Sequence, residues 1–84
     1  MNEQYVLYQY DSCPFCRRVR TFLERAGIDM PMRDTMRDMV AFRELLIGGG
    51  RPTVPCLKIT DATGKTTWLY ESNDIIDYLS RVAA

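Results

Sequence analysis

The sequence contains no histidine, only three cysteines and two lysines, and no long hydrophobic run. Without histidine, zinc sites that combine cysteine with histidine are excluded, as are cysteine–histidine pairs and serine–histidine–aspartate triads. Eleven basic and eleven acidic residues balance, so no overall field favours nucleic acid or an anionic membrane. Apolar runs fall far short of the roughly 20 residues of a transmembrane helix, and the polar start is unlike a secretory signal. We therefore expect a cytoplasmic monomer that contacts neither nucleic acid nor membrane.

The length of 84 residues suits one compact domain, which we expect to span residues 1–84. Apolar patterning and turn residues predict the element order β-α-β-α-β-β-α. This order predicts an α/β fold with a four-stranded mixed sheet flanked by three helices. The predicted strands are 5–10, 28–34, 56–60 and 66–70, and the helices follow residues 13, 35 and 71.

Helical spacing also predicts which side chains enter the core. We expect Thr35 and Asp38 to cap the second helix, and Ser72 to be the N-cap of the last one. The first strand should be buried on both faces, and four methionines should fill the core, namely Met30, Met32, Met36 and Met39. The expected inward residues are Phe15, Val19, Phe22, Leu23 and Ala26 in the first helix, Met36, Met39, Val40, Phe42, Leu45 and Leu46 in the second, and Ile75, Ile76, Leu79 and Val82 in the last.

The clearest chemical motif is the pair Cys13 and Cys16, separated by Pro14 and Phe15. In a reducing compartment, two cysteines at this spacing near a strand-to-helix junction indicate redox chemistry or metal binding. The sequence has no second pair of this kind, and Cys56 is the only other thiol. A four-ligand metal site within one chain would need unusual ligands, so we expect redox chemistry and no metal.

The expected helix start gives the two cysteines different roles. The sulfur of Cys13 should lie near unpaired backbone N–H groups at the positive end of the helix dipole, which favours the thiolate. Arg17 and Arg18 add positive charge there, although the Arg17, Arg18, Arg20 cluster is also compatible with a solvated face. The thiolate is the attacking species, so Cys13 is the predicted nucleophile. Cys16, one turn later and more buried, is predicted to resolve a mixed disulfide on Cys13.

Three segments together resemble the glutaredoxin family: residues 10–16 (YDSCPFC), residues 53–55 (TVP) and residues 71–74 (ESND). They occur in the family's order, and the resemblance covers nearly the whole chain. It implies a thioredoxin-like (glutaredoxin) fold and a dithiol glutaredoxin activity. Such an enzyme reduces glutathione mixed disulfides and protein disulfides, with glutathione as co-substrate and no tightly bound cofactor. Its partners would be glutathione and glutathionylated or disulfide-bonded proteins.

The resemblance also implies a binding site for the middle of glutathione. Pro55 would follow a cis peptide bond and face Cys13. Val54, which follows Thr53 in the motif, would bond the cysteinyl part of glutathione through its backbone. Cys56 should be a buried strand residue, with a third redox thiol as the alternative.

The two ends of glutathione would meet other residues. The resemblance places Ser72 and Asn73 at the γ-glutamyl carboxylate, where a helix N-terminus independently favours an anion. Arg51 would hold the glycyl carboxylate as a guanidinium fork. Tyr10 stands where many glutaredoxins carry a lysine that helps to hold thiolate or glutathione, so it joins the predicted ligand contacts. The first-turn arginines Arg17 and Arg18 can also attract anionic glutathione. The alternatives are a plain N-cap for Ser72, a surface charge for Glu71 and a solvated loop residue for Arg51.

One departure from the family gives an alternative function. Glu71 and Ser72 replace the usual pattern before the last helix, and they resemble the Glu-Ser pair of glutathione S-transferase N-terminal domains, which binds the same γ-glutamyl group. Those transferases also need an all-helical domain, for which 84 residues leave no room. A glutathione-binding module without redox turnover is therefore the second hypothesis. An iron–sulfur cluster carrier is the third, because in the resembling family the cluster-binding members more often carry glycine at the position of Pro14.

Overall fold

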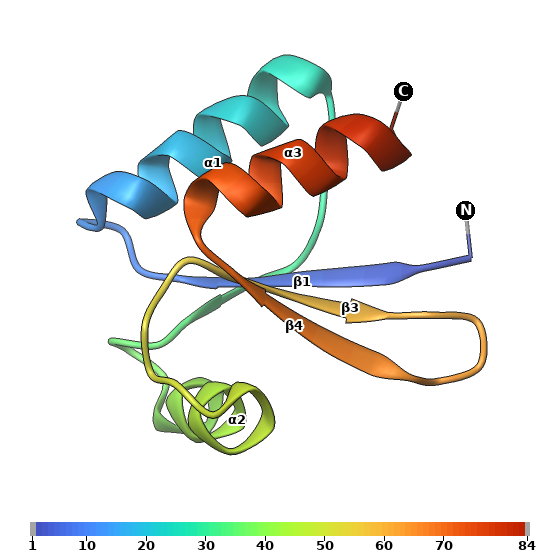
Figure 1. Ribbon diagram of the computed structural model, residues 1–84. Helices are drawn as coiled ribbons and strands as arrows, with labels where there is room; N and C mark the ends of the chain where they lie inside the picture. The colour runs from blue at the N-terminus through green and yellow to red at the C-terminus, as the bar shows by residue number, and fades with distance from the viewer. Residues whose placement is uncertain (1, 84) are drawn as a thin grey trace.

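A computed structural model of the chain describes residues 2–83. It contains four strands and three helices in the predicted order, β-α-β-α-β-β-α (Figure 1). Within the described residues, no helix combines the length and the apolar character that crossing a membrane requires. The elements are β1 (Gln4–Gln9), α1 (Pro14–Ala26), β2 (Met32–Asp34), α2 (Met39–Gly49), β3 (Cys56–Thr60), β4 (Thr66–Tyr70) and α3 (Ser72–Val82).

The four strands form one mixed sheet in the order β2-β1-β3-β4. β1 is parallel to β2 and antiparallel to β3, and β3 is antiparallel to β4. The predicted mixed sheet is therefore confirmed. β2 has only three residues, because Pro31 has no N–H for the ladder and the strand begins after it. β2 lies at the edge of the sheet, where a neighbouring proline is tolerated.

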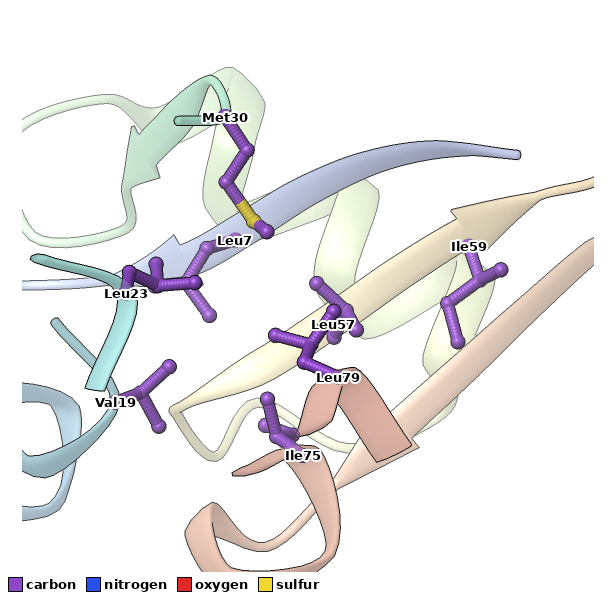
Figure 2. Packing of buried hydrophobic residues seen from close by; sticks show 8 residues of the cluster. All are labelled: Leu7, Val19, Leu23, Met30, Leu57, Ile59, Ile75 and Leu79. Atoms are coloured by element: carbon purple, nitrogen blue, oxygen red, sulfur yellow. The ribbon is translucent and has the colours of Figure 1, made fainter. Parts of the chain in front are cut away.

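The helices cover the two faces of the sheet unequally. Figure 1 shows α1 and α3 side by side on one face and α2 on the other. Successive strand residues point to opposite faces, so each strand contributes to both sides. The larger core, drawn in Figure 2, lies under α1 and α3 and consists of Leu7, Val19, Leu23, Met30, Leu57, Ile59, Ile75 and Leu79. The smaller core lies under α2 and consists of Tyr8, Ala41, Leu45 and Cys56.

The start of α2 differs from the expectation. Asp38 is the N-cap and accepts hydrogen bonds from the N–H groups of Val40 and Ala41 at 2.9 and 3.3 Å. Thr35 does not cap the helix, because residues 35–37 form a turn before it. That turn is held by Asp34, whose carboxylate accepts from the N–H groups at positions 36 and 37. Short acidic side chains thus organise both the turn and the cap.

The predicted inward face of α2 is largely wrong. Only Ala41 and Leu45 of this helix are buried, whereas Met39, Val40 and Leu46 are exposed, as are Met32 and Met36 before the helix. The filling of the core by four methionines is therefore confirmed only for Met30. The helix contacts the sheet through a narrow stripe, so its remaining apolar residues face away.

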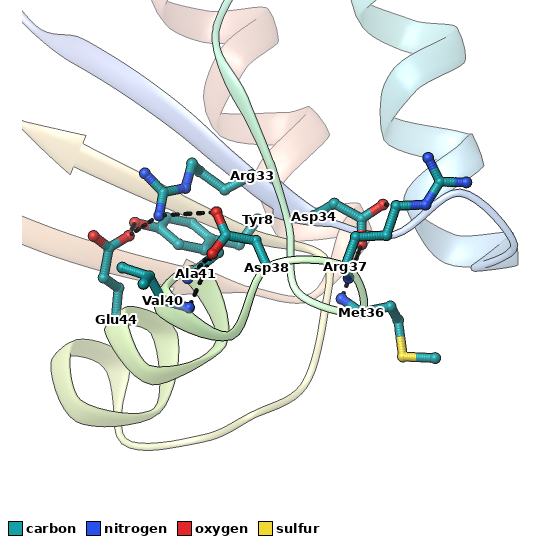
Figure 3. A network of polar contacts seen from close by, with 9 residues as sticks. All are labelled: Tyr8, Arg33, Asp34, Met36, Arg37, Asp38, Val40, Ala41 and Glu44. Atoms are coloured by element: carbon teal, nitrogen blue, oxygen red, sulfur yellow. Dashed lines mark hydrogen bonds and ion pairs between the residues drawn. The ribbon is translucent and has the colours of Figure 1, made fainter.

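Polar contacts hold the inner side of α2 to the sheet. Arg33 in β2 pairs with Asp38 at 3.5 Å and with Glu44 at 3.2 Å, and the Tyr8 hydroxyl donates to Glu44 at 2.8 Å (Figure 3). Farther along the helix, Gly48 packs closely on the sheet, since a Cβ there would lie 2.2 Å from the ring of Trp68. These contacts fix which side of α2 turns inward.

Two other burial predictions are also wrong in part. In α1 the buried residues are Cys16, Val19 and Leu23, whereas Phe15, in the first turn of the helix, is 59% exposed. Ala26, at the end of the helix, is exposed as well. In β1 only residues 7–9 are buried, because the first half of the strand extends past the cover of the helices.

Candidate functional site

Cys13 is the N-cap of α1, as predicted. Its backbone is extended, Pro14 occupies the first helical position, and its sulfur accepts a hydrogen bond from the Cys16 N–H at 3.1 Å. An N–H donor aimed at sulfur, at the positive end of a helix, favours thiolate over thiol. The first turn contains no acidic residue that would oppose this effect.

Cys16 lies one turn into α1 and is fully buried. Burial, and after it the hydrogen bond with Cys13, raises the pKa of Cys16 to about 12, although the Tyr10 backbone and the positive charge of Arg20 act in the opposite direction. Cys13, Cys16 and Cys56 are all free thiols. Burial thus disfavours the thiolate form of Cys16.

The segment before β3 approaches the first cysteine from the sheet side. The Val54–Pro55 peptide bond is cis, which confirms the expectation taken from the family resemblance. The Cys13 sulfur lies 4.0 Å from the Val54 carbonyl oxygen. Cys56, the next residue after Pro55, is buried under α2, as predicted for a strand residue.

A cleft of about 460 Å³ lies next to the Cys13 loop: Cys13 itself does not line it, but Val54, whose carbonyl oxygen is 4.0 Å from the Cys13 sulfur, does. It runs from the start of α1, past the cis peptide bond, to the start of α3. The cleft is more polar than apolar, which suits a small charged ligand better than a hydrophobic one. Its lining consists of Phe15, Arg18, Val54, Pro55, Glu71, Ser72, Asn73 and Asp74.

The start of α3 forms one end of the cleft, in a way the sequence did not predict. Glu71, not Ser72, is the N-cap, and its backbone has a φ of 76°. No side chain caps the helix, so the first-turn N–H groups face the cleft without a side-chain acceptor. Ser72 is the first helical residue and is buried. Asp74 adds a carboxylate in the same turn.

Arg18 connects the two helices across the cleft. Its guanidinium donates to the Asn73 side-chain oxygen at 2.7 Å and to the Ser72 hydroxyl at 3.5 Å. The sequence predicted that Arg18 adds positive charge near Cys13 and attracts anionic glutathione, but it predicted neither these contacts nor Phe15 and Asp74 as lining residues. The arginine and its partners are more than 50 residues apart along the chain. No local sequence pattern could have paired them.

Three predicted ligand residues lie outside this cleft. The Arg51 guanidinium stacks on the Tyr70 ring at 4.2 Å, and its backbone exchanges hydrogen bonds with the Tyr70 hydroxyl. Tyr10 borders a smaller hollow on the other side of the Cys13 loop. Thr53 is exposed and does not line the cleft. Of the predicted residues, Val54, Pro55, Glu71, Ser72 and Asn73 line the cleft, and Cys13 lies next to Val54, whereas these three lie elsewhere.

Comparison with known protein families gives one match. Residues 7–84 match the model of the family "Glutathione S-transferase, N-terminal domain". No curated protein matches the chain.

Several solved structures share its fold. Maleylacetoacetate isomerase from Anaeromyxobacter dehalogenans 2CP-1, with glutathione bound in its active site, is 24% identical with a TM-score of 0.73, and the match covers 98% of this chain and 38% of that one. Glutathione transferase E6 from Drosophila melanogaster is 27% identical with a TM-score of 0.72, covering 96% and 36%. A thioredoxin-like protein is 20% identical with a TM-score of 0.68, covering 88% and 97%.

The chain therefore spans little more than a third of the isomerase and transferase structures, but nearly all of the small thioredoxin-like protein. The likeness to the latter confirms the predicted thioredoxin-like fold. The family match adds the features of a transferase N-terminal domain, which the pair Glu71 and Ser72 had indicated. With this fold and a match over residues 7–84, the chain belongs to the glutathione S-transferase N-terminal domain family.

Proposed function

We propose that the chain binds glutathione in the cleft between α1 and α3 and catalyses glutathione-dependent thiol–disulfide exchange through Cys13. The observation that carries this proposal is the position of Cys13. Its sulfur accepts a hydrogen bond from the Cys16 N–H at the start of α1 and lies 4.0 Å from the carbonyl oxygen of Val54, which lines the polar cleft. Family membership supports glutathione as the ligand, and the paired thiols support the redox reaction.

The end of the cleft at the start of α3 carries groups of both charge signs, which suits the γ-glutamyl group of glutathione. Its carboxylate would meet the uncapped N–H groups of α3 and the guanidinium of Arg18. Its ammonium group would meet the carboxylates of Glu71 and Asp74. The cysteinyl backbone would then lie along Val54, with its sulfur directed toward Cys13.

The proposed reaction begins with attack of the Cys13 thiolate on the glutathione sulfur of a mixed disulfide. A new disulfide forms between Cys13 and glutathione, the old one breaks, and the substrate thiolate leaves and takes a proton from water. A second glutathione thiolate can then attack the glutathione sulfur, which frees Cys13 and yields glutathione disulfide. Alternatively, Cys16 attacks Cys13 and releases glutathione.

A second candidate is a glutathione-binding module without redox turnover, which holds glutathione or docks on a partner chain. The family match and the short share of the transferase structures that the chain covers favour it. The two candidates agree on the ligand and differ in whether Cys13 exchanges disulfides.

The test is a glutathione-coupled assay on a glutathionylated protein, with calorimetry to measure glutathione binding. We expect wild type to turn over, Cys13→Ser to lose activity, and Cys16→Ser to keep it on this substrate. Cys16→Ser should lose activity on protein disulfides, which need both thiols. Cys56→Ala is the matched control, because its thiol lies under α2. Wild type that binds glutathione without turnover would favour the second candidate, and activity of Cys13→Ser would exclude the proposed nucleophile.

A further inference from the structure

A single arginine holds the segment that joins β1 to α1. Arg20 lies four residues after Cys16 on α1, so the two side chains share one side of the helix. Its Nη1 donates to the Gln9 side-chain oxygen and to the Tyr10 carbonyl oxygen, the latter at 3.3 Å. Its Nη2 donates to the Asp11 carbonyl oxygen at 3.0 Å. Three consecutive residues before the active loop are therefore bound to one guanidinium.

These contacts reach Cys13 through the backbone. The Tyr10 carbonyl oxygen that accepts from Arg20 also accepts from the Cys13 N–H at 3.3 Å. Gln9 is only 5% exposed, so without Arg20 its side-chain oxygen would lose a partner in a place that water barely reaches. Loss of the guanidinium therefore loosens the end of β1 and the backbone position of Cys13 together.

Arg20 also places a positive charge near the second thiol. Within residues 2–83, the charged and titratable side chains that act on Cys16 are Cys13 and Arg20. The charge of Arg20 favours the Cys16 thiolate, against the burial that disfavours it. Arg20 thus affects both the position of the Cys13 sulfur and the ionisation of the Cys16 thiol.

We propose that Arg20 is a positioning residue for the resolving step, in which Cys16 attacks glutathionylated Cys13. This role rests on the proposed function. In the step, Cys16 gives its proton to water and its thiolate attacks the Cys13 sulfur. A disulfide forms between Cys13 and Cys16, the bond between Cys13 and glutathione breaks, and glutathione leaves as a thiolate. Arg20 holds residues 9–11 and thereby the position of Cys13, and its positive charge favours the Cys16 thiolate. The first exchange, which uses Cys13 alone, depends on Arg20 less.

The experiment follows the two steps separately in Arg20→Gln, Arg20→Lys and a control, Arg25→Gln. Arg25 lies on the same helix, is exposed, and has no hydrogen bond or ion pair with the described residues. For the resolving step, each protein is glutathionylated with glutathione disulfide, and loss of the glutathione adduct is followed by intact mass at several pH values. For the first exchange, turnover on a glutathionylated protein is measured in the Cys16→Ser background.

We expect Arg20→Gln to slow resolution about tenfold and the first exchange much less, because small displacements of reacting atoms carry large rate penalties. The rise of the resolution rate with pH should shift to higher pH, which a purely structural role would not cause. Arg20→Lys should restore the pH profile but only part of the rate, since one ammonium cannot span the three acceptors.

Equal slowing of both steps with an unchanged pH profile would overturn the positioning role, as would resolution by Arg20→Gln at the rate of Arg25→Gln. Failure of the proposed function looks different. In that case wild type itself would not lose its glutathione adduct to Cys16, or would not turn over in the Cys16→Ser background. Thermal unfolding of each variant, measured in parallel, reports any general loss of stability.

Discussion

Glu71 is the only non-glycine residue within 2–83 that has a positive φ, and it borders the candidate ligand cleft. A side chain at this backbone conformation is strained, and such strain costs about 1–3 kcal/mol. The strained residue ends β4 and starts α3 in a single step, which leaves the first N–H groups of the helix open to the cleft. The strain thus lowers stability at a position where the uncapped N–H groups of α3 can bind a ligand.

Replacement of Glu71 by glycine should therefore raise stability and weaken ligand binding at the same time. Glycine adopts a positive φ readily, so we expect the free energy of unfolding to rise by about 1 kcal/mol. Loss of the carboxylate should lower the affinity for S-methylglutathione about tenfold. Chemical denaturation and calorimetry measure the two effects. Loss of stability in Glu71→Gly would show that the side chain has a structural role that outweighs the strain.

At the scale of elements, α1 and α3 meet both in the apolar core and through one polar bridge across the cleft. Arg18 on α1 donates to Asn73 on α3 at 2.7 Å, and it also reaches the Ser72 hydroxyl. The apolar stripes of the two helices pack in the larger core and fix their spacing. This bridge lies at the cleft, where the Arg18 guanidinium can release Asn73 and bind a ligand carboxylate instead.

Arg18→Gln should therefore weaken ligand binding more than it weakens the fold. We expect the affinity for S-methylglutathione to fall about tenfold, because a guanidinium contact to a carboxylate is lost. The melting temperature should change little, since exposed hydrogen bonds and ion pairs contribute little to stability. Arg25→Gln on the same helix is the control and should bind as wild type does. Equal affinities of Arg18→Gln and Arg25→Gln would show that the arginine is only a helix-to-helix contact.

The sequence predicted elements well where the information was local. Cys13 at the start of α1 followed from Pro14 and the spacing of apolar residues, and the β3–β4 hairpin followed from its turn residues. The inward side of α2 did not follow, because apolar residues surround this helix and single out no face. The arginine bridge and the stacking of Arg51 on Tyr70 could not be predicted either, since both join side chains far apart in the chain.

At the scale of the whole molecule, a carboxylate joins the two ends of the described chain. The Glu3 side chain accepts hydrogen bonds from the hydroxyls of Tyr5 and Tyr78, both at 2.6 Å. The two tyrosine rings meet edge to face with centroids 6.5 Å apart. The residue before β1 is thereby held to α3, and the clamp needs the ionised form of one acid.

This clamp should make part of the stability dependent on pH. The hydrogen bonds from Tyr5 and then Tyr78 hold the pKa of Glu3 below its ordinary value of 4.5. A carboxyl whose pKa is lowered by folding stabilises the protein above its unfolded pKa, and this contribution disappears as the pH falls through the folded pKa. We expect Glu3→Gln to be less stable than wild type at neutral pH and to approach it in acid.

The measurement is chemical denaturation at several pH values from neutral to acidic. Glu24→Gln is the matched control, because Glu24 is an exposed acid on α1 whose side chain has no hydrogen bond or ion pair with the described residues. If Glu3→Gln and Glu24→Gln differ from wild type by the same amount at every pH, the tyrosine clamp does not contribute to stability.

The close contact between Gly48 and Trp68 has a spectroscopic consequence. Trp68 is the only tryptophan of the chain, and it lies between α2 and the sheet, with Lys58 above its ring at 5.4 Å and Tyr8 beside it. Its fluorescence is therefore an intrinsic reporter of the attachment of α2. The cleft beside Cys13 is lined by other residues, so the emission distinguishes loosening of α2 from events at the thiols.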